Sequence, residues 1–250
     1  MKLAATVAVL VALTGTAYAD DVSDLLSGAR KECRGCDLHG ASFKKADLSG
    51  VDFTGANLTD ASFHRAILKG AIFDKVTADA ANFNLTDLSN ASFVGATVTN
   101  ALFYQSQLSG AKLDGANLSG ARLQNARMTR VSAVKAIFDQ AVMTNVRLNN
   151  ANLDGASLVK TNLEQASVGN SNFDNTHFDN AGLLNAKASD TSFKAATVNI
   201  TDFYGADLHD ADFSNATVTG CRFTTADMTS VVLTGAKLSR NFMADGHFEP

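Results

Sequence analysis

The chain has 250 residues and a formal net charge of −4, with 18 glycines, 16 phenylalanines, no tryptophan and one proline. This length is sufficient for one large core or a long repeat array. Proline ordinarily marks loops, and the single one here is Pro250, so the composition excludes a loop-rich domain. The mild acidic surplus favours solubility and neither indicates nor excludes a charged polymer as partner.

Residues 1–19 have the organisation of a secretory signal peptide. Lys2 supplies a charged start, an apolar run follows at 3–13, and the Ala-Tyr-Ala at 17–19 fits a cleavage site. We expect cleavage before Asp20, which predicts a periplasmic or secreted protein. An uncleaved membrane anchor is the alternative, but the apolar run is short for a bilayer. Nothing downstream offers the roughly 20 consecutive apolar residues that a span requires.

The segment 20–35 is predicted to cap the fold that follows it. Val22, Leu25 and Leu26 lie at helical spacing behind two aspartates, which indicates a short amphipathic helix. A cap is needed because a stack of strands leaves unpaired backbone groups at its end.

Cys33 and Cys36 form a Cys-x-x-Cys in this segment. Exported thiols usually end as disulfides, so we expect a disulfide that pins the cap to the fold. A redox-active dithiol is the alternative, although no thioredoxin-like strand and helix pattern surrounds the pair. Zinc is not expected because no second Cys or His pair supplies ligands, and Asp37 in place of histidine excludes haem attachment. Cys221 is predicted to be a buried, inert thiol.

From Leu38 to Phe248 a large apolar residue returns at every fifth position. These positions, called centres below, number 43, of which 17 are Leu, 15 Phe, 4 Met, 4 Val and 3 Ala. The residue two before each centre is small, and it is Ala in 27 repeats. The residue two after it is Gly 12 times and Asn 10 times, and both tolerate the positive φ of tight turns.

A period of five fits neither a helix nor a simple strand. Successive centres would spread around a helix of 3.6 residues per turn, and an odd step alternates between the two faces of a strand. A chain that bends every five residues satisfies the pattern, because each repeat then points its centre and its small residue at one axis.

The A(D/N)LxG units, such as residues 46–50 and 116–120, resemble those of pentapeptide-repeat proteins, and the resemblance covers residues 36–250. It implies an all-β solenoid, namely a right-handed quadrilateral β-helix with four repeats, or 20 residues, in each coil. The 43 repeats then make about 11 coils behind a short N-terminal capping helix. We therefore expect a signal peptide at 1–19, a cap with the Cys-x-x-Cys at 20–35 and the β-helix at 36–250.

Coils of twenty residues predict that centres twenty apart stack in ladders. One ladder begins Phe43, Phe63, Phe83 and Phe103, and the ladder facing it begins Phe53, Phe73 and Phe93. Residues 241–250 lose the small residue and are expected to fray. Some relatives dimerise through a C-terminal helix, and the absence of that pattern here predicts a monomer.

The residues offer no catalytic, cofactor-binding or metal-binding constellation, so neither an enzyme nor a cofactor is expected. The five histidines fall on different sides and coils and are interpreted as solvated surface. Aspartate recurs directly before the centre, where a convex rod offers no cleft, and is interpreted as a solubilising residue. These aspartates are Asp37, Asp47, Asp52, Asp87, Asp202, Asp207, Asp212 and Asp227.

Two surface features are candidate binding sites. Arg127 and Arg147 are twenty residues apart in a basic segment and are predicted to stack, which with Arg130 suggests an anion-binding strip. Ordinary variation in surface charge is the alternative. The side that carries the longer Phe ladder also presents outward apolar residues, and aromatic residues are favoured at protein interfaces. This candidate contact surface comprises Leu102, Tyr104, Val142, Leu184 and Tyr204.

The function favoured by these residues is a non-catalytic, exported scaffold in the periplasm or cell envelope, structural or protein-binding, with an unidentified partner. The first alternative is a DNA-mimicking topoisomerase (gyrase) inhibitor, as some family members are. The signal peptide and the basic central segment speak against it, and a nucleic-acid partner is not expected. The second alternative is a thiol redox function at Cys33 and Cys36.

Overall fold

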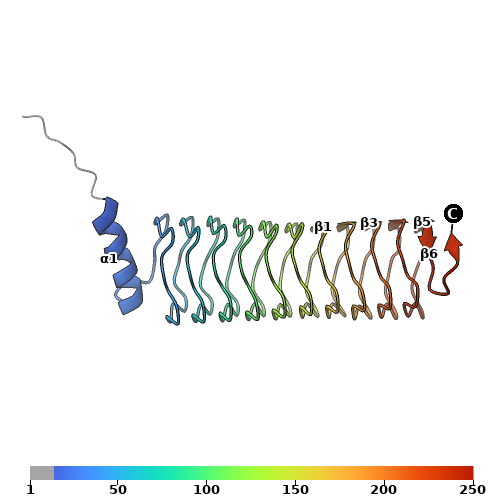
Figure 1. The fold of residues 1–250 in the computed structure, drawn as a ribbon, viewed down its shortest axis with the longest axis horizontal. Coiled ribbons are helices and arrows are strands. Elements are labelled where there is room, and N and C mark those ends of the chain that lie inside the picture. The colour runs from blue at the N-terminus through green and yellow to red at the C-terminus, as the bar shows by residue number, and fades with distance from the viewer. Residues whose placement is uncertain (1–13, 250) are drawn as a thin grey trace, which may run out of the picture.

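The computed structural model describes residues 14–249, which form a rod of stacked coils with one helix, α1, at its N-terminal end (Figure 1). The predicted signal peptide therefore lies mostly outside the described residues. Within the described part of the chain, α1 falls short of the length and apolar character needed to cross a membrane.

The coils repeat every twenty residues. Five short strands pair in parallel, in the order β1-β2-β3-β4-β5, and each is displaced by twenty residues from its neighbour. They are β1 (Ser157–Val159), β2 (His177–Asp179), β3 (Thr197–Asn199), β4 (Thr217–Thr219) and β5 (Lys237–Ser239). Single-residue parallel bridges continue the step of twenty on all four sides of the rod. The first bridged residue, Glu32, and the last, Phe242, are 210 positions apart, or ten and a half coils, close to the number expected.

The corners explain the period of five. Every fifth residue from Gly35 to Arg240 has a positive φ, whether or not it is glycine. In most repeats the N–H that follows the corner donates to the carbonyl of the centre, as Ala41 does to Leu38 at 3.0 Å. Positive φ at the third residue of the turn is the mark of a type II turn. Residues other than Gly, Asn and Asp are strained in this conformation, and the β-branched Ile200 at φ 47° is the clearest case.

The core is a column of stacked rings and aliphatic side chains. Phe43 and Phe63 stack with their centroids 5.0 Å apart, and Phe63 and Phe83 do so at the same distance. The facing ladder contacts these rings edge-on, for example Phe53 against Phe63 at 5.9 Å. The predicted ladders are therefore confirmed.

The small inward position lies beside this column and accepts hydroxyl groups when their hydrogen bonds are satisfied. Thr86 and Thr161 are buried at this position, and each Oγ1 donates to a backbone carbonyl of the preceding coil at 2.8 Å. A buried hydroxyl with a partner has little net cost, which explains why Ser and Thr replace Ala there.

The aspartates before the centres have a structural role that the sequence interpretation missed. Asp47 Oδ1 accepts hydrogen bonds from the N–H and the hydroxyl of Ser49, at 3.0 and 2.6 Å. The same arrangement joins Asp52 to Thr54 and Asp87 to Ser89. These carboxylates therefore satisfy turn N–H groups, which is the usual role of Asp in an Asx-turn.

Hydrogen bonding lowers the pKa of these carboxyl groups. At Asp47 and Asp227 the hydroxyl and the N–H two residues on are the main causes, and both favour the ionised form. At Asp52 burial alone would raise the pKa, but the bonds from Thr54 and Arg34 outweigh it. A carboxyl group whose pKa is lower in the folded state stabilises the fold above the unfolded pKa. That contribution is lost as the pH falls through the folded pKa.

We expect the double variant Asp47→Asn/Asp227→Asn to be less sensitive to acid than the parent. Asn117 already makes the same two bonds to Ser119, at 3.0 and 2.6 Å, so an amide can replace the carboxylate. At pH 7 the urea midpoint should change little, whereas below about pH 4, the pKa of an unfolded aspartate, the variant should lose less stability. Replacement by Ala should lower stability at every pH, and identical acid profiles for the Asn variant and the parent would contradict this role.

Specific contacts are made at both ends of the rod, although Leu233, Phe242 and Phe248 stay exposed at the C-terminal end. Helix α1 spans Thr14–Ser27 and therefore continues through the predicted cleavage point; only its part from Asp20 onward would remain in the mature chain. Leu25 is buried and Val22 packs against the core, but Leu26, expected on the same stripe, is 50% exposed. Gly28, with a positive φ, ends the helix.

At the C-terminal end, β6 (Asn241–Phe242) pairs antiparallel with β7 (Phe248–Glu249). Asn241 is fully buried where other repeats have a small residue. Its Oδ1 accepts from the N–H of Cys221 at 2.9 Å, and its Nδ2 donates to the carbonyl of Val218 at 3.1 Å. The expected fraying of the last coil is therefore wrong for this residue, because the larger side chain completes the backbone hydrogen bonding there.

Candidate functional site

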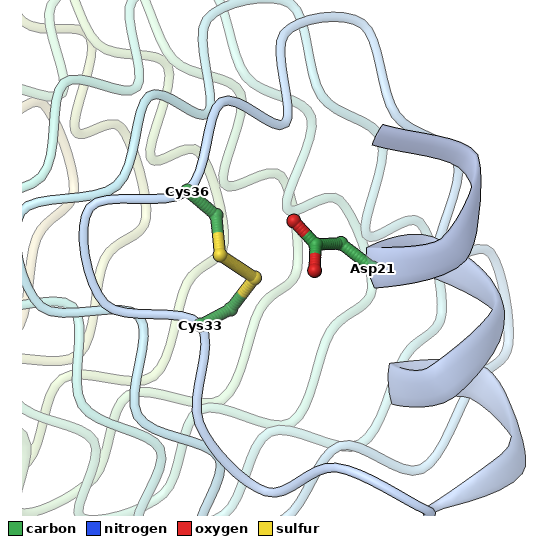
Figure 2. A group of neighbouring side chains, drawn as sticks. All are labelled: Asp21, Cys33 and Cys36. Carbon is green, nitrogen blue, oxygen red and sulfur yellow. A yellow bond between two sulfur atoms is a disulfide. The ribbon is translucent and has the colours of Figure 1, made fainter. Parts of the chain in front are cut away.

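The N-terminal end of the rod contains a disulfide between Cys33 and Cys36, which closes the turn that enters the first coil (Figure 2). Cys33 is fully buried. The carboxylate of Asp21 points from α1 toward the two sulfur atoms and also pairs with Arg30. The Asp21–Arg30 pair ties α1 to the segment that follows it, while Leu25 and Val22 pack α1 against the core.

The disulfide also limits the chemistry of this end. Asp21, Cys33 and Cys36 are the one cluster within residues 14–249 whose His, Cys, Asp or Glu ligand atoms lie close enough to hold a metal ion. In this structure the two sulfur atoms are bonded to each other, so they offer no thiolate ligand. A buried Cys33 is also poorly placed for exchange with another thiol.

The turn between the cysteines is tied to the second coil by an ion pair. Arg34 Nε donates to Asp52 Oδ2 at 2.8 Å, and a terminal nitrogen of the same guanidinium lies 2.8 Å from that oxygen. Asp52 is itself nearly buried. The cap, the disulfide turn and the first two coils therefore form one connected unit.

The five residues proposed as a contact surface, called the tyrosine face below, lie on one side of the rod in two groups. Leu102 and Tyr104 are in one coil and Val142 is two coils further, whereas Leu184 lies one coil before Tyr204. Tyr104 and Tyr204 are 43% and 39% exposed, and the other three are half-buried.

Other residues interrupt this side. Arg122 lies between Leu102 and Val142, within the first group, and Asn162 and Gly182 follow Val142 in the same column. The Arg222 guanidinium covers the ring of Tyr204 at 4.8 Å from its centroid and pairs with Asp202. The structure therefore does not unite the five residues into one apolar patch.

A polar groove of about 890 Å³ runs along one edge of the rod over six coils. One wall consists of corner residues with long amide side chains, which are Gln105, Asn125, Asn145, Gln165 and Asn185. The other wall consists of the strand residues two positions further on, and its charged members are Asp87, Arg127, Arg147 and Lys187. It is larger than the hollows lined by Asp207 and Asp227 and by Met228 and Met243, of about 450 and 360 Å³.

Two of the three predicted strip residues lie in this groove. Arg127 and Arg147 are bridge partners in adjacent coils, as expected from their spacing. Arg130 occupies the next corner of its coil, at φ 58°, and does not line the groove. The sequence analysis missed the amide wall. The wall is apparent only when the corner residues are aligned at steps of twenty and compared with the row of strand residues two positions further on.

The remaining candidate residues are not brought together. Among the described residues, no two histidines share a metal-ligand cluster; His209 pairs with Asp210 at 3.0 Å, and His247 contacts Asp245. Cys221 is buried, and burial raises the pKa of its thiol to about 11. The thiol is therefore protonated at neutral pH and is a poor nucleophile.

The geometry defines the class of protein: a four-sided β-solenoid with one bend in every five residues. A family model described as pentapeptide repeats matches eight copies, over residues 36–74, 81–120, 121–158, 156–194 and 201–240. The chain therefore belongs to the pentapeptide-repeat family.

One of the solved structures that match this chain shows the same fold. HetL, a pentapeptide-repeat protein involved in heterocyst differentiation regulation in the cyanobacterium Nostoc sp. strain PCC 7120, is 23% identical. The match has a TM-score of 0.63 and covers 92% of this chain and 98% of HetL. QnrB1, a plasmid-mediated fluoroquinolone resistance protein, is 21% identical over 58% of this chain and 85% of its own, with a TM-score of only 0.42. No curated protein matches the sequence significantly.

Proposed function

We propose that this pentapeptide-repeat protein is a non-catalytic, exported scaffold of the periplasm or cell envelope that binds a protein partner through the tyrosine face. The observation that carries the proposal is that Tyr104 and Tyr204, which are 43% and 39% exposed, lie on the same side of the rod, with Arg222 over one face of the Tyr204 ring. The two tyrosines are 100 residues and thus five coils apart, or about 24 Å at the spacing of paired strands. Tyrosine is enriched where one protein surface binds another.

Export is supported by two independent features. The first 19 residues fit a signal peptide, and the cysteines at the mouth of the solenoid are joined. The DNA-mimicry alternative requires a continuous acidic side, whereas Arg127, Arg130 and Arg147 lie exposed at the centre of the rod.

Site-specific photocrosslinking in the native cells tests this proposal. A benzophenone side chain at Tyr104 or at Tyr204 should capture the same partner protein in the cell envelope. The benzophenone-labelled chain in the adduct should begin at Asp20. A benzophenone at Val134, on the opposite side of the rod, is the matched control. The proposal fails if all three positions give the same adducts or none, or if the captured protein lies in the cytoplasm.

A further inference from the structure

We infer that the polar groove is a binding site for a linear acidic oligosaccharide, a chain of sugar units that carry carboxylates. The walls of this site include none of the five residues of the tyrosine face, although the two surfaces adjoin where Gln105 Nε2 donates to Tyr104 Oη at 3.1 Å. The inference rests on the charge, the polarity and the repeat distance of the groove.

The charge of the groove selects an anion. Arg127, Arg147 and Lys187 project from one wall as exposed side chains, and none of them has an ion pair within residues 14–249. Asp87, at the N-terminal end of the groove, is instead paired with Lys69 at 3.4 Å. A guanidinium binds a carboxylate through two parallel N–H bonds, so the arginines supply the strongest sites for such a ligand.

The facing wall selects a ligand rich in hydroxyl groups. The side chains of Asn125, Asn145, Gln165 and Asn185 each offer a carbonyl acceptor and an NH₂ donor. A hydroxyl group both donates and accepts, so a row of amides matches a row of hydroxyls. A ligand between the two walls therefore meets amides on one side and, in three of the six coils, a cation on the other.

The repeat distance favours a sugar chain. Neighbouring coils present equivalent side chains at the spacing of paired strands, about 4.8 Å. This distance is close to the length of one pyranose unit in a linear chain, so successive units meet equivalent positions. An extended peptide advances by about 3.3 Å per residue and by twice that between side chains on one face, so it falls out of register within a few coils.

The lining residues do not fit two other kinds of linear anion, single-stranded nucleic acids and acidic peptides. Leu85, at one end, is the one large apolar residue among the lining side chains, and no aromatic ring is among them. Single-stranded nucleic acids are bound through aromatic side chains on which the bases stack, and extended peptides through pockets for alternate side chains. The groove offers neither.

Calorimetry at low ionic strength with an α-1,4-linked galacturonate hexamer tests the inference. The mature protein should bind this hexamer and should not bind the neutral glucose hexamer of the same linkage. Because the groove spans six coils, affinity should rise from the dimer to about the hexamer and then level off. Salt should weaken binding, since the cations are exposed.

The double variant Arg127→Gln/Arg147→Gln should weaken hexamer binding at least tenfold. The matched control, Arg130→Gln/Lys135→Gln, makes the same change in net charge outside the groove and should alter binding less than twofold. Thermal unfolding of both variants shows that the rod is intact.

The inference is overturned if no hexamer binds, if both variants lose affinity equally, or if a glutamate hexapeptide or oligo(dT) binds more tightly. Photocrosslinking at Tyr104 and Tyr204 should be unaffected by either double variant, which keeps this test independent of the proposed protein partner.

Discussion

Phe73→Ala should lower the free energy of unfolding by about 4–5 kcal/mol, the upper part of the range for a buried phenylalanine. Phe73 is completely buried and contacts four other rings. It stacks on Phe53 at 5.0 Å and on Phe93 at 4.7 Å. It also meets Phe63 and Phe83 edge-on, at 5.8 and 5.7 Å. Each aromatic pair stabilises by about 0.5–1.5 kcal/mol beyond the burial of area.

Phe138 provides the matched control, because it is equally buried but has no ring partner among the described residues. Phe138→Ala should therefore cost about 3 kcal/mol, the lower end of the same range. The difference should persist when both residues are changed to Leu, which fills more of the space but cannot stack on a ring. Equal losses at the two positions in urea unfolding would contradict a contribution from the aromatic column.

Hydrogen exchange should show that the effect of Phe73→Ala is local. In a solenoid each coil contacts only its neighbours, so stability is close to a sum of coil and interface contributions. Exchange should accelerate most in residues 50–100 and least beyond residue 200. A uniform increase along the chain would indicate that the rod unfolds in one step.

Removing the disulfide is the second change with a large expected effect. By the chain-entropy estimate for so short a loop, Cys33→Ala/Cys36→Ala should cost about 2 kcal/mol. The loss should appear in α1 and the first two coils, because the disulfide turn is joined to Asp52 through Arg34 at 2.8 Å.

Limited proteolysis measures this effect directly. Cleavage within residues 20–60 should accelerate in the double variant, and in the parent protein after reduction, while residues 100–200 stay protected. Cys221→Ala is the control for removal of a cysteine far from the cap. The interpretation of the Cys33–Cys36 disulfide as a structural link would be wrong if reduction left this region equally resistant.

The fold was predictable because one pattern of five residues recurs along most of the chain. Centres such as Phe43 and Phe63 identified both the inward side and the ladders, and the structure places them as expected. The number of sides came from the resemblance to a family, because a bend every five residues fits more than one polygon. The start of α1 was misplaced because helical signals and signal-peptide signals overlap in residues 14–19.

The surface was predicted less well, because outward residues are constrained less by the fold. Asp47 was interpreted as solubilising, although the serine two positions later is the signal of a capped turn. Asn241 was interpreted as the start of fraying. Its buried hydrogen bonds could not be foreseen, because they join residues about twenty positions apart in the sequence. The predicted stacking of Arg127 and Arg147 is present, whereas anion binding by these residues stays a prediction. The amide wall facing them has no distinctive local sequence.

Distances between paired spin labels test the central claim, that the chain advances by one coil for every twenty residues. Asn57, Ile137, His177 and Thr217 lie on one side of the rod, in a single column of bridged residues. With one label at Asn57 and the other at Ile137, His177 or Thr217, the account predicts a steady increase of about 10 Å for each step of two coils. Distances that stay constant or fall as the sequence separation grows would contradict the solenoid and everything inferred from it.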